Sequence, residues 1–228
     1  MSYYDRHTRH HLAVDTIIFG FDKERLKLLL IKRDFEPCSG QWSLMGGFVR
    51  EKESLDAAAE RILFELTGIK DVYLEQLAAY GDPERDSAGR VISVSYYALI
   101  DSVRFDEDIS KNYTASWFEL EEIPELIFDH RIMVDKALRR LRRKCKTQPV
   151  GFELLPEKFT LPQLMKLYEA IFQQSFDKRN FRKKILSFGV LKKLEEKDHE
   201  GSKKGAFLYK FEKEKYEELI QNGFGFEI

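Results

Sequence analysis

Hydrophobic and polar positions in the first half of the chain follow a β-type pattern of short apolar runs separated by turns. Residues 13–21 and 26–33 are two such runs, and the polar turn between them predicts a β-hairpin. Gly46 and Gly47 fall inside a third run, residues 42–49, and are expected to break a short strand there. Further strands are predicted at 72–80, 91–100 and 117–118.

Two segments of this half have helical periodicity. Ser54 is a good N-cap and Gly68 a natural stop, which predicts a helix over residues 55–67. Residues 129–146 predict a second helix with an apolar side and a basic side. Its apolar side is expected to hold Ile132, Met133, Ala137, Leu138 and Leu141, and its basic side Arg139, Arg140, Arg142, Arg143, Lys144 and Lys146. Pro149 then breaks the pattern, so we predict domains at residues 1–150 and 151–228.

The C-terminal part predicts two helices joined by a short turn. Thr160 can cap a helix over 161–174, and a second helix follows at 177–187. Phe181, Ile185 and Phe188 form the buried stripe of the second helix. Its opposite face carries Arg179, Asn180, Arg182 and Lys183. Because Arg and Asn suit bidentate contacts with base edges in the major groove, this arrangement predicts a helix-turn-helix.

A two-stranded wing is predicted after the second helix. Residues 190–194 and 206–211 read as strands around a charged hairpin that carries Lys203 and Lys204, which can contact phosphates. A final helix at 212–221 is expected to pack on the core. We predict Arg179, Asn180 and Lys183 as readers of bases, with the wing touching the DNA backbone. The alternative is that the basic face is only solvated.

Composition limits the class of protein. The chain has 228 residues, 43% hydrophobic and 34% charged, which suits two domains with real cores. Cys38 and Cys145 are far apart, which excludes a disulfide scaffold or an ordinary zinc site and suits a reducing cytosol. The sequence shows no signal-peptide pattern and no run near the roughly 20 apolar residues of a membrane span. We therefore expect a cytoplasmic protein without a membrane segment.

The near-neutral net charge conceals an asymmetry between the two halves. Residues 1–130 hold 15 Lys and Arg against 25 Asp and Glu, whereas residues 131–228 hold 23 against 14. This asymmetry predicts that the C-terminal part binds a polyanion. The alternative from charge alone is that two domains of opposite charge attract each other.

Residues 47–69, GFVREKESLDAAAERILFELTGI, resemble the Nudix box, G-x5-E-x7-R-E-U-x-E-E-x-G-U. The positions that match are Gly47, Glu53, Arg61, Leu63, Glu65, Gly68 and Ile69. Nudix enzymes use box glutamates to hold Mg²⁺ on a pyrophosphate, and three acidic positions share one helix face. Here those positions are Ile62, Glu65 and Leu66, so two carboxylates are replaced by apolar side chains.

This departure argues against catalysis. Glu65 alone would hold a cation at most weakly, and no other metal or cofactor is expected; Mg²⁺ would matter only for a residual hydrolase activity. The resemblance assigns Glu53 and Arg61 a bracing role in the loop–helix–loop. We therefore expect a scaffold that was kept without its catalytic function, and no catalytic residues.

A wider resemblance, over residues 12–211, is to the Nudix-related transcription regulators of NAD metabolism and sugar catabolism. It rests on the hairpin at 13–33, on residues 76–99 with Gly81-Asp82-Pro83 and Arg85-Asp86, on 128–131 and on 154–185. In that family a Nudix domain binds an effector and a C-terminal winged helix binds an operator. The resemblance implies an α+β fold in which a Nudix α/β/α sandwich with a mixed sheet precedes a winged helix-turn-helix domain.

The effector site is predicted between the box helix and the 81–90 loop. Arg85, Asp86 and Arg90 can bind hydroxyls or phosphates there, or else form loop salt bridges. His130 is expected to form a structural hydrogen bond. Family effectors are ADP-ribose-like nucleotides and pentoses, and the loss of two box glutamates tilts the prediction towards a sugar or sugar phosphate.

The sequence as a whole predicts a homodimeric, ligand-responsive regulator that binds a double-stranded DNA operator. The alternative is a Nudix pyrophosphatase acting on ADP-ribose or a related nucleoside diphosphate derivative.

Overall fold

A computed structural model describes residues 3–105, 109, 114–199 and 205–222. The chain forms two compact units, one of Met1–Gly20 and Lys27–Ala137 and the other of Phe21–Leu26 and Leu138–Ile228. The predicted domains at 1–150 and 151–228 placed the whole linking helix in the first domain, whereas the compact units divide within that helix. No helix in the described part of the chain is long and apolar enough to cross a membrane.

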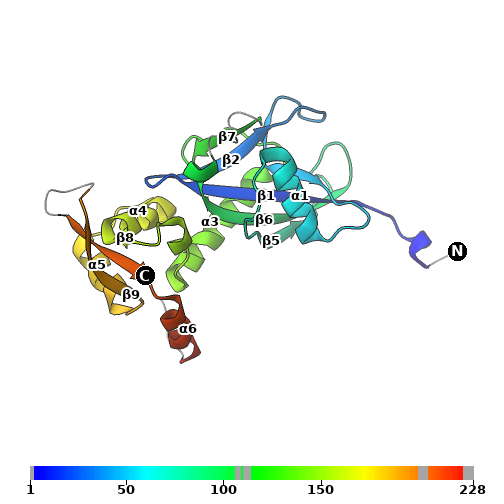
Figure 1. Cartoon of the computed structure of the whole chain (residues 1–228). Helices are drawn as coiled ribbons and strands as arrows, with labels where there is room; N and C mark the ends of the chain where they lie inside the picture. Colours follow the sequence, from blue (N-terminus) through cyan, green and yellow to red (C-terminus); the bar gives the residue numbers. More distant parts are fainter. Residues whose placement is uncertain (1–2, 106–108, 110–113, 200–204, 223–228) are drawn as a thin grey trace. The chain divides into compact units, whose positions relative to one another are not determined.

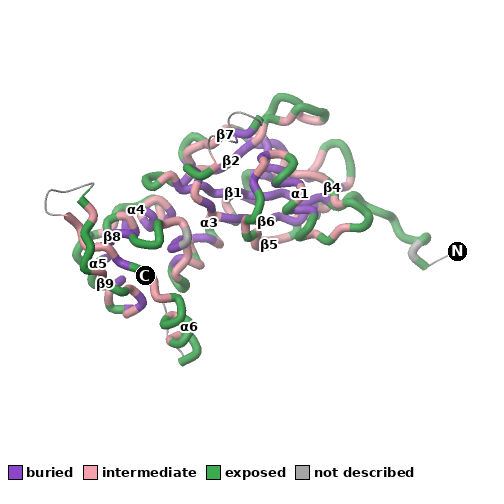
Figure 2. The backbone as a smooth tube through the Cα atoms, viewed as in Figure 1, coloured by how far each residue is buried: buried purple, intermediate pink, exposed green. Residues whose placement is uncertain are grey.

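The first unit is built on one sheet, after a short 3-10 turn at Tyr3–Arg6. Its strands are β1 (His11–Phe21), β2 (Leu26–Lys32), β3 (Trp42–Ser43), β4 (Met45–Phe48), β5 (Glu75–Tyr80), β6 (Val91–Asp101) and β7 (Ala115–Glu119). The strand order is β3-β2-β1-β6-β5, with β4 paired to β1 and β7 paired to β2. The central strand β1 is buried along almost its whole length, as Figure 2 shows.

The paired glycines do not break their strand, contrary to the prediction. Gly46 and Gly47 lie inside β4 and pair with Asp15 and Val14 of β1. The interruption falls instead at Leu44, between β3 and β4. A Cβ on Gly46 would clash with the Asp15 carboxylate of β1, so the strand needs glycine at this position.

Helix α1 (Leu55–Thr67) covers one face of the sheet, as Figure 1 shows. Ala58, Ala59 and Ile62 pack against Val14 of β1 and residues of β6. The predicted caps are confirmed: the Ser54 hydroxyl accepts from the Ala57 N–H at 3.1 Å, and Gly68 ends the helix with a φ of 73°. Both ends of this helix were therefore predicted correctly from the sequence.

Helix α3 (His130–Thr147) begins in the first unit and ends in the second. Its buried stripe is Met133, Val134, Ala137, Leu141 and Cys145. Ile132 was predicted on this stripe but is 60% exposed, because the stripe advances by three and four residues from Met133 and leaves position 132 outside it. Leu138 is half-buried.

The second unit consists of a small sheet with helices. After a 3-10 turn at Phe152–Leu154 come β8 (Phe159–Thr160), α4 (Leu161–Phe172), α5 (Lys178–Ser187), β9 (Leu191–Asp198), β10 (Ala206–Phe211) and α6 (Lys213–Gln221). The sheet has the order β8-β10-β9 with antiparallel pairs. Strand β9 extends four residues beyond the predicted end of its run. Helix α6 buries no residue fully, so it packs on the core less than predicted (Figure 2).

Candidate functional site

A buried polar cluster lies on the face of the sheet opposite α1. Val14 faces α1, so its neighbour Asp15 points to the other face. The Asp15 side chain is 7% exposed and accepts a hydrogen bond from the Ser93 hydroxyl at 2.5 Å. Two further polar side chains, those of Arg85 and His130, approach the same carboxylate.

Arg85 balances the charge of the cluster. Its side chain is 3% exposed, and its guanidinium donates to both carboxylate oxygens of Asp129 at 3.0 and 2.7 Å and lies 3.8 Å from Asp15. Burial by itself would lower the pKa of Arg85, but the hydrogen bonds and charges of Asp129, with the charge of Asp15, raise that pKa overall. Arg85 is therefore a fixed cation that ties the 81–90 loop to β1 and to the residue before α3.

His130 is neutral and has a defined tautomer. Burial lowers its pKa, although the nearby Asp15 opposes this effect. Its Nδ1 accepts from the Leu44 N–H at 3.2 Å, so the proton is on Nε2, which lies 3.5 Å from Asp15. The structural hydrogen bond expected of His130 is therefore present, and it holds the break between β3 and β4.

A cavity of about 140 Å³ opens over this cluster. Its floor contains Asp15, Ser43, Arg85 and His130, and Gly46 and Gly47 expose backbone beside them. Three aromatic side chains and a second arginine complete the lining: Phe35, Phe48, Phe128 and Arg33. The cavity thus combines a charged floor with an aromatic rim, the composition expected of a site for a polar ligand with a ring system.

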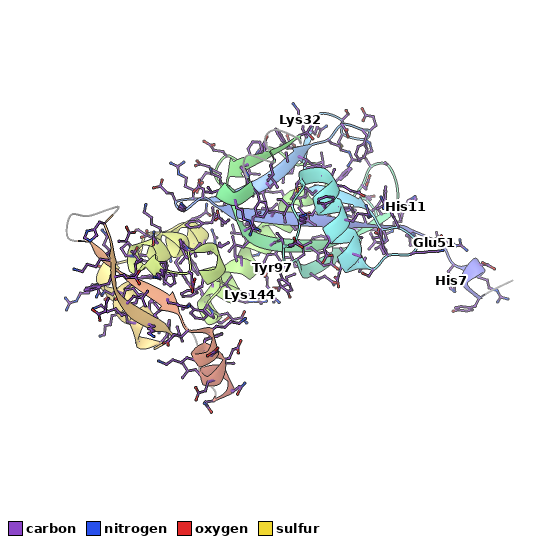
Figure 3. The ribbon with its side chains drawn as sticks, in the orientation of Figure 1. His7, His11, Lys32, Glu51, Tyr97 and Lys144 are labelled. Carbon is purple, nitrogen blue, oxygen red and sulfur yellow. The ribbon has the colours of Figure 1, made fainter. Side chains whose placement is uncertain are left out.

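The rim has a layered arrangement of aromatic and cationic groups. The Arg33 guanidinium lies 3.9 Å from the Phe35 ring centroid and 5.8 Å from that of Phe128. Phe35 is 55% exposed and Phe48 is 58% exposed. His11, labelled in Figure 3, contacts Phe48 with ring centroids 5.3 Å apart. Exposed aromatic faces of this kind can stack on a base.

The structure brings together two of the three predicted effector residues. Arg85 and Asp86 line the cavity. Arg90 is not among its lining residues in the described part of the chain; it donates to the Gly81 carbonyl at 2.7 Å and closes the loop. The sequence placed the effector site between the box helix and the 81–90 loop, whereas this cavity is lined by β1 and β4 on the face away from α1.

Asp15 and the aromatic rim were missed by the sequence reasoning. Asp15 had a signal, since it is the single charge within the apolar run 13–21. Phe35, Phe48 and Phe128 had none, because single aromatic residues in a strand or a loop are common and do not by themselves indicate a ligand site.

The Glu53–Arg61 pair predicted to brace the box does so in the structure. Arg61 donates to both Glu53 oxygens at 2.6 and 2.9 Å and to the Phe48 carbonyl at 3.1 Å. The hydrogen bonds from Arg61 and from the Arg50 N–H lower the pKa of Glu53 from 4.5 to about 2. The pair therefore fixes the end of β4 to the helix.

The residues of the box do not fit a Mg²⁺ cluster. Ile62 is 3% exposed within the core, and Leu66 is half-buried beside it. Glu65 is paired with Arg61 at 2.9 Å and with Arg50 at 3.1 Å. Within the described residues, no group of three His, Cys, Asp or Glu is placed to hold a metal ion. A multi-carboxylate site would need both replaced positions and a Glu65 released from two arginines.

Helix α5 in the second unit presents a basic surface. Phe181 and Ile185 are buried, and the predicted DNA-contacting residues Arg179, Asn180, Arg182 and Lys183 are all exposed. None of these four side chains forms an ion pair with another residue that the structure describes. Asp177 caps the helix by accepting from the Asn180 N–H at 2.8 Å. The surface is therefore available to a polyanion.

The wing is present, and its tip falls outside the described residues, including Lys203 and Lys204. On the described part, the Lys193 and Lys197 ammonium groups lie 3.6 and 4.8 Å from the Phe207 ring centroid. These two lysines extend the basic character of the unit from α5 to β9.

Comparisons with known protein families divide the chain in the same way. Residues 9–141 match the NUDIX domain family, and residues 151–211 match the NrtR DNA-binding winged helix domain. The chain is 35% identical over 210 residues to a protein of Acinetobacter baylyi named ADPR responsive transcriptional repressor NtrR, which covers 90% of this chain and 84% of that protein. It is also 34% identical over 130 residues to an ADP-ribose pyrophosphatase of Methanocaldococcus jannaschii, covering 56% of this chain and 73% of that enzyme.

Solved structures give similar results. NrtR of Shewanella oneidensis complexed with a 27mer DNA has a TM-score of 0.75 and 32% identity, covering 88% of this chain and 93% of that one. The NUDIX domain of the same protein complexed with ADP ribose has a TM-score of 0.51 and 31% identity, covering 60% and 92%. Relatives of this chain have thus been solved with DNA and with ADP ribose.

Proposed function

This chain belongs to the NrtR family of Nudix-related transcription regulators, and from that premise we propose that its Nudix domain binds an ADP-ribose-like effector that controls operator binding by its winged helix. The α+β fold class and the family resemblance predicted from the sequence are both confirmed. The observation that carries the proposal is that one relative named as an ADPR responsive repressor covers both units, 90% of the chain.

The cavity supports a ligand of this chemistry. A volume of about 140 Å³ is below the roughly 300–1,000 Å³ typical of complete ligand sites, so its enclosed part suits a ribose or a phosphate rather than the whole effector. The rest of an ADP-ribose molecule would extend over the rim, where the exposed Phe35 and Phe48 rings can stack on adenine. Asp86 can accept from ribose hydroxyls, and Arg33 can donate to phosphates.

The comparisons move the effector proposal away from a free sugar. The sequence alone tilted it towards a sugar or sugar phosphate because the metal carboxylates are missing. A regulator that only binds a pyrophosphate does not need those carboxylates, and two relatives are named for ADP-ribose. A pentose remains the control ligand in the assay below.

We propose that hydrolysis is not the physiological role of the chain. Glu65 is held by two arginines, and the other two box positions are apolar and at least half-buried. The pyrophosphatase of M. jannaschii keeps the enzyme alternative open to a direct test. Release of nucleotide from ADP-ribose with Mg²⁺, abolished by Glu65→Gln, would establish the enzyme; no turnover above that of Glu65→Gln supports the regulator.

The test of the regulator is fluorescence anisotropy with labelled genomic duplexes, beginning with the region upstream of the gene for this chain. Each duplex is compared with a scrambled one at near-physiological salt, with and without ADP-ribose, arabinose and xylose. We expect one duplex to bind specifically and ADP-ribose alone to change its Kd. Specific binding changed only by a pentose would replace the effector, and no specific duplex among genomic fragments would overturn the proposal.

A matched pair of variants tests the reading surface. Asn180→Ala is expected to weaken specific binding by about 10-fold or more, because a bidentate base contact contributes about 1–3 kcal/mol of discrimination, and to leave scrambled-duplex binding unchanged. Lys166→Gln on α4, whose side chain pairs with Glu24, is the control and should bind both duplexes as the parent does. Equal effects of Asn180→Ala on both duplexes would remove Asn180 from base reading.

We also propose a homodimer in the cytoplasm. Two recognition helices must reach successive major-groove faces of a palindromic operator, which a two-fold dimer achieves. Sedimentation of the chain alone and with a palindromic duplex measures this: we expect two chains per duplex. One chain per duplex at saturation would exclude the dimer.

A further inference from the structure

Helix α3 begins at the floor of the effector cavity. His130, its first residue, lines the cavity together with Phe128, and Asp129 between them receives both hydrogen bonds of Arg85. Phe128 has a φ of 50°, a conformation that non-glycine residues seldom adopt. The start of α3 is thus fixed by buried groups that a ligand in the cavity would touch.

Arg142, twelve residues further along α3, is fixed to the end of α4 in the second unit. Its Nε donates to the Ile171 carbonyl at 2.8 Å and its Nη2 donates to the Gln173 side-chain oxygen at 2.5 Å. The last carbonyls of a helix have no partner within the helix, and a guanidinium satisfies this one with geometry that an ammonium cannot copy. Gln173 is also the left-handed C-cap of α4, with a φ of 53°. Arg142 therefore fixes Gln173, the residue at which α4 ends.

The segment from the end of α4 to α5 is short and packed with aromatic rings. Phe172 contacts Phe176 with centroids 6.0 Å apart, and Phe176 contacts Phe181 of α5 at 5.6 Å. The Phe176 N–H donates to the Glu169 carboxylate of α4 at 2.9 Å. A change in the last turn of α4 would therefore shift the start of α5, since well-packed contacts of this kind do not deform freely.

We propose that Arg142 is a positioning residue for operator recognition. By fixing the end of α4 to α3, it orients α5 and so transmits the state of the effector cavity to the DNA-binding surface. This inference rests on the proposed function. Arg142 is not among the described residues that line the cavity and does not lie on α5; its role is to fix the α4–α5 turn to α3, which begins at the cavity. Energetic coupling between distant sites requires such a chain of fixed contacts or an equivalent two-state element.

The test compares Arg142→Gln with Arg143→Gln. Arg143 is the exposed neighbour on α3, so its variant removes the same charge without removing the bonds to α4. For each variant, anisotropy gives the Kd for the specific and for the scrambled duplex. The Kd for the specific duplex with saturating ADP-ribose, divided by the Kd without it, is the ADP-ribose ratio. Calorimetry gives the Kd for ADP-ribose itself.

We expect Arg142→Gln to bind ADP-ribose as the parent does, to lose about 10-fold in specific-duplex affinity and to bring the ADP-ribose ratio close to one. Arg143→Gln should keep the parent ratio, and both variants should bind the scrambled duplex alike. Arg142→Lys can donate to the Ile171 carbonyl but cannot form both bonds of the guanidinium, so it should recover part of the parent ADP-ribose ratio. This variant tests the inference if Arg142→Gln does not fold.

The outcome that overturns this inference is an Arg142→Gln protein with the same specific affinity and ADP-ribose ratio as Arg143→Gln. Failure of the proposed function would look different, because the parent protein itself would then show no specific duplex or no response to ADP-ribose.

Discussion

Replacing Arg85 with methionine removes the cation that balances the buried cluster while retaining much of the side-chain volume. In the parent protein the Arg85 side chain is 3% exposed, and its guanidinium donates twice to Asp129 and lies 3.8 Å from Asp15. Asp129 and Asp15 have side chains only 15% and 7% exposed, so water cannot replace the lost partner without opening the loop. The variant therefore leaves two buried carboxylates without their counter-charge.

The expected loss of stability follows from that exposure. Breaking a buried ion pair by removing one partner costs about 3–5 kcal/mol, because the remaining charge stays desolvated. A unit of this size changes its melting temperature by about 3–4 °C per kcal/mol, so we expect a decrease on the order of 10–20 °C. Effector affinity should decrease as well, since Arg85 forms part of the cavity floor.

Thermal unfolding of the full chain measures the effect, with Arg90→Met as the control. Arg90 lies in the same loop, is half-buried and donates to the Gly81 carbonyl at 2.7 Å, so its loss should cost about 1–2 kcal/mol. Adding Asp129→Asn to Arg85→Met should recover part of the loss, because one uncompensated charge is then removed. Melting of Arg85→Met within about 2 °C of Arg90→Met would refute the reasoning.

Three further predictions concern neighbouring parts of the chain. Gly46→Ala should destabilise the first unit by about 1–3 kcal/mol in thermal unfolding and weaken ADP-ribose binding, because its Cβ would meet the Asp15 carboxylate; Gly89→Ala, with open space around it, should do neither. Glu53 has a pKa lowered to about 2, so its stabilisation is complete above pH 4.5 and is lost as pH falls towards 2; urea unfolding across that range should show the loss, and a Glu53→Gln variant should lack it. Thr160→Ala removes the capping box of α4 and should cost about 1 kcal/mol in urea unfolding, with no change if the cap is not formed in solution.

The parts of the fold that the sequence predicted well are those that local rules determine. Both caps of α1 and the start of α4 were predicted from single residues, because an N-cap hydroxyl or a C′ glycine acts on its own helix. The basic face of α5 followed from the spacing of Phe181, Ile185 and Phe188. Burial of one stripe leaves the other side exposed, so the surface was predicted together with the core.

The effector cavity could not be predicted in the same way, because its parts meet only in three dimensions. Asp15 and Ser93 are 78 residues apart, and their contact depends on the pairing of β1 beside β6. The role of Gly46 depends on the same strand, since only the β1–β4 register places the Asp15 carboxylate against it. The rule that paired glycines interrupt strands therefore predicted a break at Gly46, whereas the glycine is needed because the Asp15 side chain of β1 lies against it.

The Nudix box of this chain separates two tasks that the motif normally combines. The Glu53–Arg61 pair needs only two side chains on adjoining elements, and it is formed with hydrogen bonds of 2.6 and 2.9 Å. The metal task needs three carboxylates on one helix face, and here Ile62 occupies one of those positions inside the core. Restoring Glu at position 62 would bury a charge next to Gly47, where space is so limited that a Cβ added to the glycine would lie 2.8 Å from the Ile62 side chain. The box therefore keeps the Glu53–Arg61 pair that braces the loop, while the packing of Ile62 opposes a metal cluster.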